Sequence, residues 1–363
     1  MVYPKGNHMN WRRGNMRMTW KQLITSASLA AVLMYMGIAN EGAAGARPLA
    51  EADFESAPAQ ASVSAPAAAV SLQTTGKKTG TGYSFDKGIT RISLPAGTQS
   101  VSIANTNGTI EIKQGNVKEM EVHMTVTVHQ ATADEAKAVA DKAGMKVSKG
   151  ADLEIRTYSG SYGNWRYPSL DLTVTLPQGM KAELQAETEN GNLSLSKVSS
   201  TGRIELAAVN GNISASGIGN ALKLHTVNGN VQVSEAKDRV EVTVTNGNVK
   251  AEQIAGDLTL KATNGNVSVK DALAAVEAVT VAGNIHVRSR KVGGDWKVTT
   301  AVGDVELAWP GDAGVVVDAE SAFEEIETDF PLTLKNHRAS GKLGAGTYQI
   351  RAKSMAGLSL MQN

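Results

Sequence analysis

Residues 222–269 read LKLHTVNGNVQVSEAKDRVEVTVTNGNVKAEQIAGDLTLKATNGNVSV, and the same unit returns in them every 18 residues. The unit is marked by the triplet Asn-Gly-Asn. This triplet occurs at 190–192, 210–212, 228–230, 246–248 and 264–266, with degenerate copies at 282–284 and 302–304. Self-similarity at a fixed short period is the signature of a repeat architecture, so the body of the chain is predicted to be an array of equivalent units.

Apolar residues alternate with polar ones on both sides of each triplet. The apolar pairs that follow the triplets are Leu193/Leu195, Ile213/Ala215, Val231/Val233, Val249/Ala251, Val267/Val269, Ile285/Val287 and Val305/Leu307. The inward-facing sets that precede them include Ile204/Leu206/Ala208, Leu222/Leu224/Thr226, Val240/Val242/Val244 and Leu258/Leu260/Ala262. Strict alternation predicts strands with one buried and one solvated face, so each unit is strand, short turn, strand, Asn-Gly turn.

Two all-β architectures fit this unit: a parallel β-solenoid with coils of about 18 residues, or an antiparallel meander with Asn-Gly hairpins. One outward-facing column distinguishes them. It reads Glu205, Lys223, Glu241, Thr259, Glu277 and Lys297. Alternating charges at equivalent positions stabilise strands that stack about 4.8 Å apart, and a meander gives no reason to keep such a column. The pattern therefore favours the parallel β-solenoid.

The Asn-Gly-Asn triplet is predicted to form a corner of each coil. Glycine adopts φ > 0 without steric cost, and asparagine tolerates the same region. The second asparagine, at 192, 212, 230, 248, 266 and 284, is expected to form an amide ladder between stacked coils. A calcium-binding repeat would need Asp-rich turns that this sequence lacks, so no metal site is predicted.

The segments that flank the repeats carry weaker signals. Residues 107–112 resemble a half-coil, and Thr132-Ala133-Asp134-Glu135 is a capping box that predicts a short helix over 132–143, covering one end of the solenoid. Residues 348–352 and 357–360 are read as a last coil. The insertion near 318–345 is expected to be a long loop or an extra hairpin.

The N-terminal segment has the order of a secretory signal. Five cations precede an uncharged run over 23–39, and Ala44-Gly45-Ala46 is a small-x-small cleavage site, so the exported chain would begin at Arg47. An uncleaved inner-membrane anchor is the alternative. The predicted organisation is a signal peptide over 1–46, a flexible Ala/Ser/Pro-rich tether over 47–82, an N-terminal β region with the capping helix over 83–180, regular solenoid repeats over 181–310, and a C-terminal insertion with the last coil over 311–363.

The recurring Asn-Gly-Asn strands, together with Leu172-Thr173-Val174-Thr175-Leu176-Pro177-Gln178-Gly179, resemble the bacterial putative-adhesin family of β-strand-repeat domains, a domain family of unknown function. The resemblance covers about 85 to 360. It implies a role at the cell surface or in the envelope, and it implies no catalytic residues.

Composition excludes several chemistries. The chain of 363 residues has no cysteine, so it has no disulfide, thiol nucleophile or zinc-thiolate site. Its 36 Lys and Arg balance 35 Asp and Glu, which argues against nucleic-acid binding through phosphate neutralisation. No histidine has metal-ligand spacing, so these side chains are expected on solvated faces. No cofactor and no catalytic residue is predicted, although Glu205, Glu241 and Glu277 lie on one face, as a polysaccharide-active enzyme would need.

One segment concentrates aromatic side chains: Tyr158, Tyr162, Trp165 and Tyr167, with Arg166 between them. Exposed aromatics on a Gly-rich loop bind sugar rings or anchor protein partners, so these five residues are the candidate ligand-binding residues. The alternative is that they pack on the end of the solenoid.

The sequence thus predicts an exported, non-enzymatic, adhesin-like or scaffolding β-repeat protein of the bacterial envelope, periplasmic, surface-bound or secreted. The partner would be an envelope glycan or protein. The alternatives are an envelope-stress or regulatory accessory that binds a membrane protein, and a polysaccharide-active β-helix enzyme.

Overall fold

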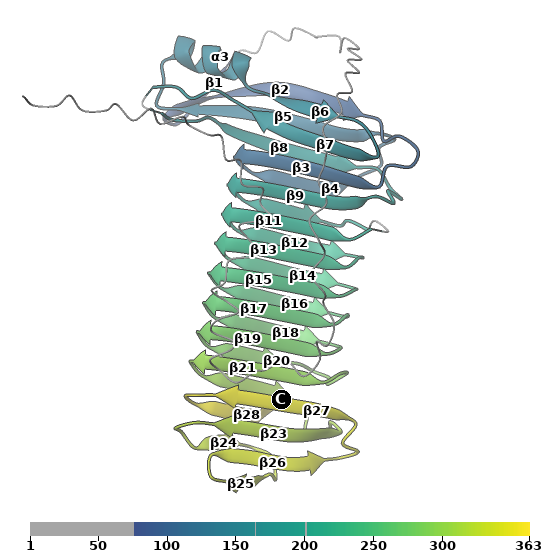
Figure 1. The fold of residues 1–363 in the computed structure, drawn as a ribbon, viewed down its shortest axis with the longest axis vertical. Helices are drawn as coiled ribbons and strands as arrows, with labels where there is room; N and C mark the ends of the chain where they lie inside the picture. The colour runs from purple at the N-terminus through teal and green to yellow at the C-terminus, as the bar shows by residue number, and fades with distance from the viewer. Residues whose placement is uncertain (1–75, 164, 200–201) are drawn as a thin grey trace, which may run out of the picture. The chain divides into compact units, whose positions relative to one another are not determined.

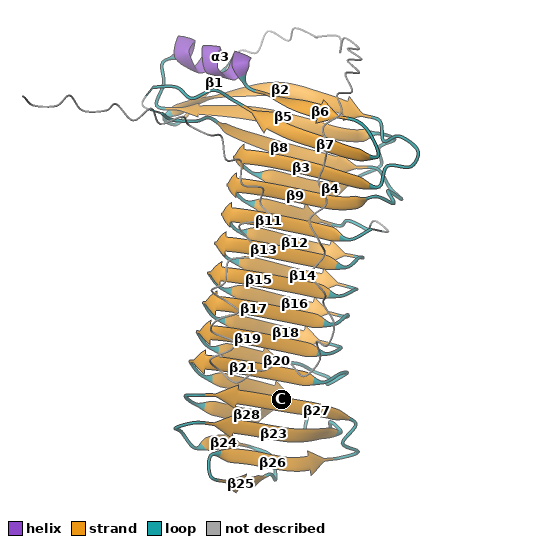
Figure 2. Ribbon diagram, viewed as in Figure 1, coloured by secondary structure: helices purple, strands orange, loops and turns teal. Residues whose placement is uncertain are grey.

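The computed structural model describes residues 76–163, 165–199 and 202–363. In these residues the chain forms two 14-stranded sheets and a single helix, α3 (Ala133–Lys142) (Figures 1 and 2). The strands of the regular repeats pair in parallel throughout. The predicted parallel β-solenoid is therefore confirmed, and the antiparallel meander is excluded.

Each sheet contains strands from the whole of the described chain. Sheet A runs, in spatial order, through β1 (Lys77–Thr79), β2 (Gly82–Ile92), β5 (Met120–His129), β8 (Ser169–Leu176), β4 (Ile110–Gln114), β10 (Leu193–Ser196), β12 (Ile213–Ile218), β14 (Val231–Ala236), β16 (Val249–Ile254), β18 (Val267–Ala272), β20 (Ile285–Arg288), β22 (Val305–Trp309), β28 (Leu358–Gln362) and β24 (Ile326–Thr328). Sheet B runs through β25 (Thr333–Lys335), β26 (Arg338–Leu343), β23 (Val315–Ser321), β27 (Tyr348–Ser354), β21 (Trp296–Val302), β19 (Val276–Ala282), β17 (Leu258–Asn264), β15 (Val240–Asn246), β13 (Leu222–Asn228), β11 (Ile204–Asn210), β9 (Glu183–Asn190), β3 (Ser100–Asn107), β7 (Asp152–Tyr158) and β6 (Gly144–Ser148).

One coil takes a strand from sheet B, turns, and continues as a strand of sheet A. Stacking follows the repeat in register: Val231 pairs with Ile213 on one side and with Val249 on the other. The alternation gives the expected facing, because Val242 is buried whereas its neighbour Thr243 lies on the outer face. The core between the sheets is thus built from columns of similar small and branched side chains, which explains the low aromatic content.

We call the turns that lead from sheet B into sheet A the asparagine corner. Here the first asparagine of each triplet forms the amide ladder, since Asn228 Nδ2 donates to Asn210 Oδ1 over 2.9 Å and the contact repeats from Asn107 to Asn264. The second asparagine, predicted to form this ladder, mainly accepts a backbone N–H from the next coil, as Asn212 Oδ1 does from Asn230 N over 2.8 Å. The predicted ladder therefore exists, but mostly in the neighbouring column.

The glycines of this corner are needed mainly because the backbone of the neighbouring coil leaves no room for a Cβ, and less because of their own backbone dihedral angles. A Cβ on Gly229 would lie 2.0 Å from the carbonyl oxygen of Gly211, and the same close approach recurs along the column. Gly247 and Gly265 have φ of 148° and 151°, but Gly229 lies outside the left-handed region. The expected φ > 0 thus holds for only part of the column, whereas the close approach of stacked backbones applies to all of it.

Left-handed backbone also recurs at the opposite corner, where sheet A strands lead into sheet B. The residues there with φ between 51° and 68° are Lys197, Gly217, Glu235, Gln253 and Asp271. Only one of them is glycine, so the sequence gives no sign of this column.

The N-terminal end is closed as predicted. The Oγ1 of Thr132 accepts the N–H of Glu135 and caps α3, whose Ala136 and Ala140 are buried in the core cluster. The helix lies at the end of the stack beyond β5 and β2 (Figure 1). The half-coil expected at 107–112 is also present, because β4 pairs with β10 in register.

The C-terminal end differs from the prediction. The strands β27 and β28, read as the last coil, lie between the coil of β21 and β22 and the coil of β23 and β24. The insertion is therefore a further coil followed by the hairpin of β25 and β26. Phe330 from this segment stacks on buried Trp309 with ring centroids 4.3 Å apart, which closes the core.

The strands of the regions expected at 83–180, 181–310 and 311–363 share the same two sheets. The predicted signal peptide lies outside the described residues, as does the predicted tether up to residue 75. β1 and the turn after it fall within the last residues assigned to the tether, where β1 pairs with β2.

Candidate binding loop

The aromatic segment is the asparagine corner of its own coil. β7 stacks on β3, and β8 stacks on β4, so loop 159–168 joins a sheet B strand to a sheet A strand as every Asn-Gly-Asn turn does (Figure 1). The loop therefore lies at one end of the column that the amide ladder occupies. Aromatic side chains replace asparagine at this position.

A tight turn supports the loop. The backbones of Tyr162 and Arg166 exchange two hydrogen bonds, of 2.8 and 3.0 Å. Gly163 and Trp165 both lie in the left-handed region, with φ of 51° and 59°. Left-handed backbone is unfavourable for a bulky side chain such as tryptophan, and such strain concentrates at functional sites.

Tyr162 is the anchor of the loop and not part of an exposed surface. Its side chain is 7% exposed. Its hydroxyl donates to the carbonyl of His129 over 2.9 Å and accepts the N–H of the same residue. The guanidinium of Arg166 lies 5.1 Å from its ring centroid and donates to Gln130 Oε1. The prediction that Tyr162 belongs to an exposed platform is wrong, because its hydroxyl satisfies the backbone at the end of β5.

The other three aromatics are exposed. Trp165 is 81% exposed, Tyr158 56% and Tyr167 53%. Clusters of exposed apolar side chains mark interaction sites, and tyrosine and tryptophan are enriched among the residues that anchor interfaces. The two interpretations of the segment thus divide by residue: Tyr162 packs inward, whereas Trp165, Tyr158 and Tyr167 are exposed. We call these three side chains the aromatic loop.

The histidines do not assemble a site. His123 contacts Asp86 over 2.7 Å, and His286 contacts Glu306 over 3.2 Å. His225 is half-buried rather than fully solvated, and this burial, with Lys223 nearby, lowers its pKa despite the opposing charge of Glu205. In the part of the chain that the structure describes, no three metal-ligating side chains lie together.

The acidic row proposed for an enzyme is partly neutralised. Lys223 Nζ lies 2.9 Å from Glu205, and Lys297 Nζ lies 3.2 Å from Glu277. Both pairs join successive coils, as the alternating column predicts. Their carboxylates stabilise the stack instead of facing one another across a cleft.

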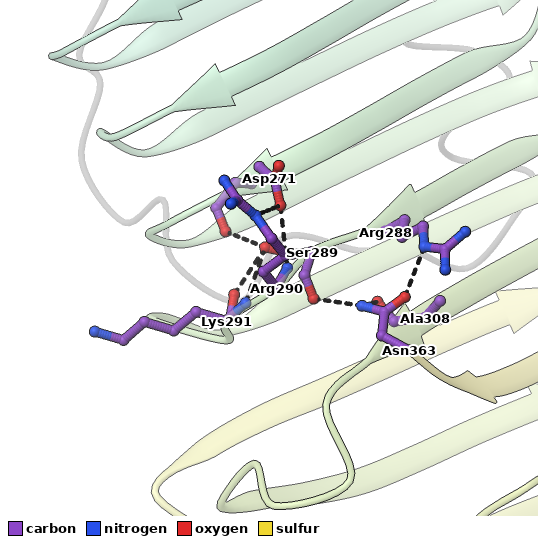
Figure 3. A network of polar contacts seen from close by, with 8 residues as sticks. Asp271, Arg288, Ser289, Arg290, Lys291, Ala308 and Asn363 are labelled. Carbon is purple, nitrogen blue, oxygen red and sulfur yellow. Dashed lines mark hydrogen bonds and ion pairs between the residues drawn. The ribbon is translucent and has the colours of Figure 1, made fainter.

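A polar network lies at the opposite corner (Figure 3). The carboxylate of Asp271 accepts the N–H and the Nε of Arg290 over 3.1 and 3.0 Å. Burial alone would raise the pKa of Asp271, but the hydrogen bonds and charge of Arg290 lower it below the ordinary value. Asn363 joins the carbonyls of Ser289 and Ala308 through its Nδ2. The contacts of Asn363 hold this residue against the neighbouring coils. We therefore interpret the network as one that stabilises the fold.

The described chain is a parallel β-solenoid that exposes three aromatic side chains at one corner. The chain belongs to the family described as Toastrack DUF4097, which matches residues 98–357. No curated protein matches the chain.

Solved structures to which the chain is similar include three bacterial proteins. They are a putative lipid binding protein from Parabacteroides distasonis (14% identity, 76% of this chain and 96% of that chain, TM-score 0.40), a putative adhesin from Bacteroides fragilis (14%, 77% and 96%, 0.33) and a putative cell adhesion protein from Clostridium sporogenes (12%, 77% and 99%, 0.23). At these identities and scores, the likenesses carry no function to this chain. None of the helices in the described segments has the length and apolarity needed to cross a membrane.

Proposed function

We propose that this chain is an exported, non-enzymatic, adhesin-like or scaffolding protein of the bacterial envelope, and that it binds its partner through the aromatic loop. The observation that carries the proposal is the exposure of Trp165, Tyr158 and Tyr167 on a corner that hydrogen bonds hold in place. A preorganised aromatic surface loses little conformational entropy on binding, which favours recognition of a glycan ring or a protein surface.

Two further features support the proposal. The cations and the uncharged run before Ala44-Gly45-Ala46 favour export, periplasmic or to the surface. The coils stack in register through backbone ladders, amide ladders and ion pairs, which suits a rigid spacer that displays a loop at one end.

A pelleting assay tests the binding role. The full chain, purified from the cells that make it, is mixed with isolated envelope of the same cells, and bound protein is separated by sedimentation. Trp165→Ala together with Tyr167→Ala should reduce the bound fraction at least tenfold and leave the melting temperature within about 2 °C, because both side chains are exposed. Ile89→Ala removes another exposed apolar side chain and serves as the matched control.

The outcomes separate the alternatives. Binding that survives the double substitution contradicts the proposal. Loss of binding together with a large loss of stability would show that the aromatic loop is structural. Enzymatic digestion of glycan or of protein in the envelope then identifies the partner class, and a single co-purified membrane protein would favour a regulatory accessory over an adhesin.

A further inference from the structure

The column that carries the amide ladder changes character toward the C-terminal end. After Asn264 its place is taken by Ala282 and then by Val302, which pair in register at the ends of their strands. On the next two coils the corner residues are Met355 and Phe323. Val302 is 66% exposed, Met355 51% and Phe323 77%. We call these three side chains the apolar ridge.

The segment that contains two of the three ridge residues, Val302 and Phe323, is rich in carboxylates. Residues 302–334 contain nine Asp and Glu and no Lys or Arg. Arg338 and Lys353 pair with Asp318 and Glu320. Glu324, Glu325 and Glu327, beside the ridge, make no ion pair with any described residue. An exposed apolar strip with an acidic rim is complementary to an apolar surface with a basic rim.

At the opposite end of the same corner, exposed aromatic side chains occur together with exposed lysines. The turn between β1 and β2 lies next to Gln130, whose N–H donates to Thr81 O and whose side chain holds Arg166 of the aromatic loop. β1, which leads into this turn, carries the exposed cations Lys77 and Lys78. The aromatic loop and the basic strand are therefore linked through Gln130 toward the N-terminal end of the corner.

We propose that the aromatic loop and Lys77–Lys78 of one copy dock on the apolar ridge and the acidic rim of a second copy, head to tail. The inference rests on the proposed function and names a second copy of this chain as a partner of the aromatic loop. The two surfaces lie toward opposite ends of the same corner column, so one copy offers each of them to a different neighbour.

The sheet edges agree with this arrangement. Sheet A ends in β1 at one end and in β24 at the other. Glu327 lies in β24 and Glu325 directly before it, and both are exposed and opposite in charge to the lysines of β1. A contact between different surfaces of two copies does not close on itself, so it generates filaments instead of dimers.

Sedimentation velocity of the full chain tests the proposal. The weight-average mass should rise with protein concentration at low salt and fall as salt screens the charged rim. Phe323→Ser with Met355→Ser should abolish this rise. Circular dichroism melts check that the variants remain folded, and Lys237→Glu, an exposed charge reversal at the opposite corner, should leave association unchanged.

Charge reversal provides a test that misfolding cannot imitate. Glu324→Lys with Glu325→Lys, and separately Lys77→Glu with Lys78→Glu, should each be monomeric alone, because like charges meet at the contact. Mixing the two proteins should restore association, since each end then meets an opposite charge. A monomer at every concentration, or a mixture that stays monomeric, overturns the proposal.

This result is independent of the pelleting assay. Envelope binding that needs Trp165 in a chain that never self-associates would leave the binding role intact and refute only the second copy. Self-association without any envelope binding would support the contact between copies and refute the envelope-binding role.

Discussion

Gly229→Ala is expected to be among the most damaging single-methyl additions in the solenoid. The new Cβ would lie 2.0 Å from Gly211 O and 2.5 Å from its carbonyl carbon. Ordinary contact begins at 3.4 Å, so the two coils would have to separate by about 1.4 Å. Both atoms belong to backbone, and no flexible side chain can move aside.

Such a separation breaks the hydrogen bonds of the corner. Asn230 N lies 2.8 Å from Asn212 Oδ1, and Asn228 Nδ2 lies 2.9 Å from Asn210 Oδ1. Each lost bond costs about 1 kcal/mol, and overpacking adds about 1–3 kcal/mol. The total is about 3–5 kcal/mol, which lowers the melting temperature of a large domain by at least about 6 °C.

Gly217→Ala is the matched control. Its Cβ would meet the nearest atom, on Lys197, at 3.5 Å, so only the cost of φ at 68° remains, about 1 kcal/mol. Thermal melts followed by circular dichroism compare the two variants. Equal losses would refute the reasoning, because they would show that the close approach at Gly229 adds nothing to the cost of the added methyl group.

The other predictions test the facing, the register and the electrostatics of the coils. Val242→Asp should unfold the repeats, because an unpaired buried carboxylate costs several kcal/mol, while Thr243→Asp should cost little; equal losses in the melts would mean that the facing is wrong. Cysteines at Gln232 and Lys250, which pair in register on the outer face, should crosslink under mild oxidation; their failure to do so would count against parallel stacking. Asp271→Asn should cost about 1–2 kcal/mol at neutral pH. The folded pKa of Asp271 is lowered, so its stabilisation is present above the unfolded value of about 3.9 and is lost as pH falls through the folded value. Urea titrations at several pH values measure this, and a pH-independent difference would contradict it.

The regular coils could be predicted from sequence because period and alternation fix them together. A strand with one buried face cannot slip by one residue, so the placement of Val231 and Val242 followed from the repeat. The helix after Thr132 could be predicted equally well, since its N-cap and its apolar face are local features of the sequence.

Features that depend on irregular backbone could not be predicted. Both asparagine columns have the same residue type, so only the structure shows which one forms the amide ladder. In the aromatic loop no period tells which ring turns inward, and Tyr162 does so because its hydroxyl reaches the backbone of His129. The C-terminal insertion lacks the Asn-Gly-Asn triplet, so the sequence does not reveal the coil of β23 and β24 that stacks on β27 and β28.

Solvent accessibility of Trp165 tests the central claim most directly. Among the described tryptophans it alone is exposed, because Trp296 and Trp309 are buried. With Trp11→Phe and Trp20→Phe in place, acrylamide quenching of the full chain reports mainly on Trp165. Addition of isolated envelope should protect Trp165 from quenching by acrylamide. Digestion of the envelope component that binds the chain should restore the quenching. Unchanged quenching at an envelope concentration that pellets the protein would contradict the account, because the chain would then bind through another surface.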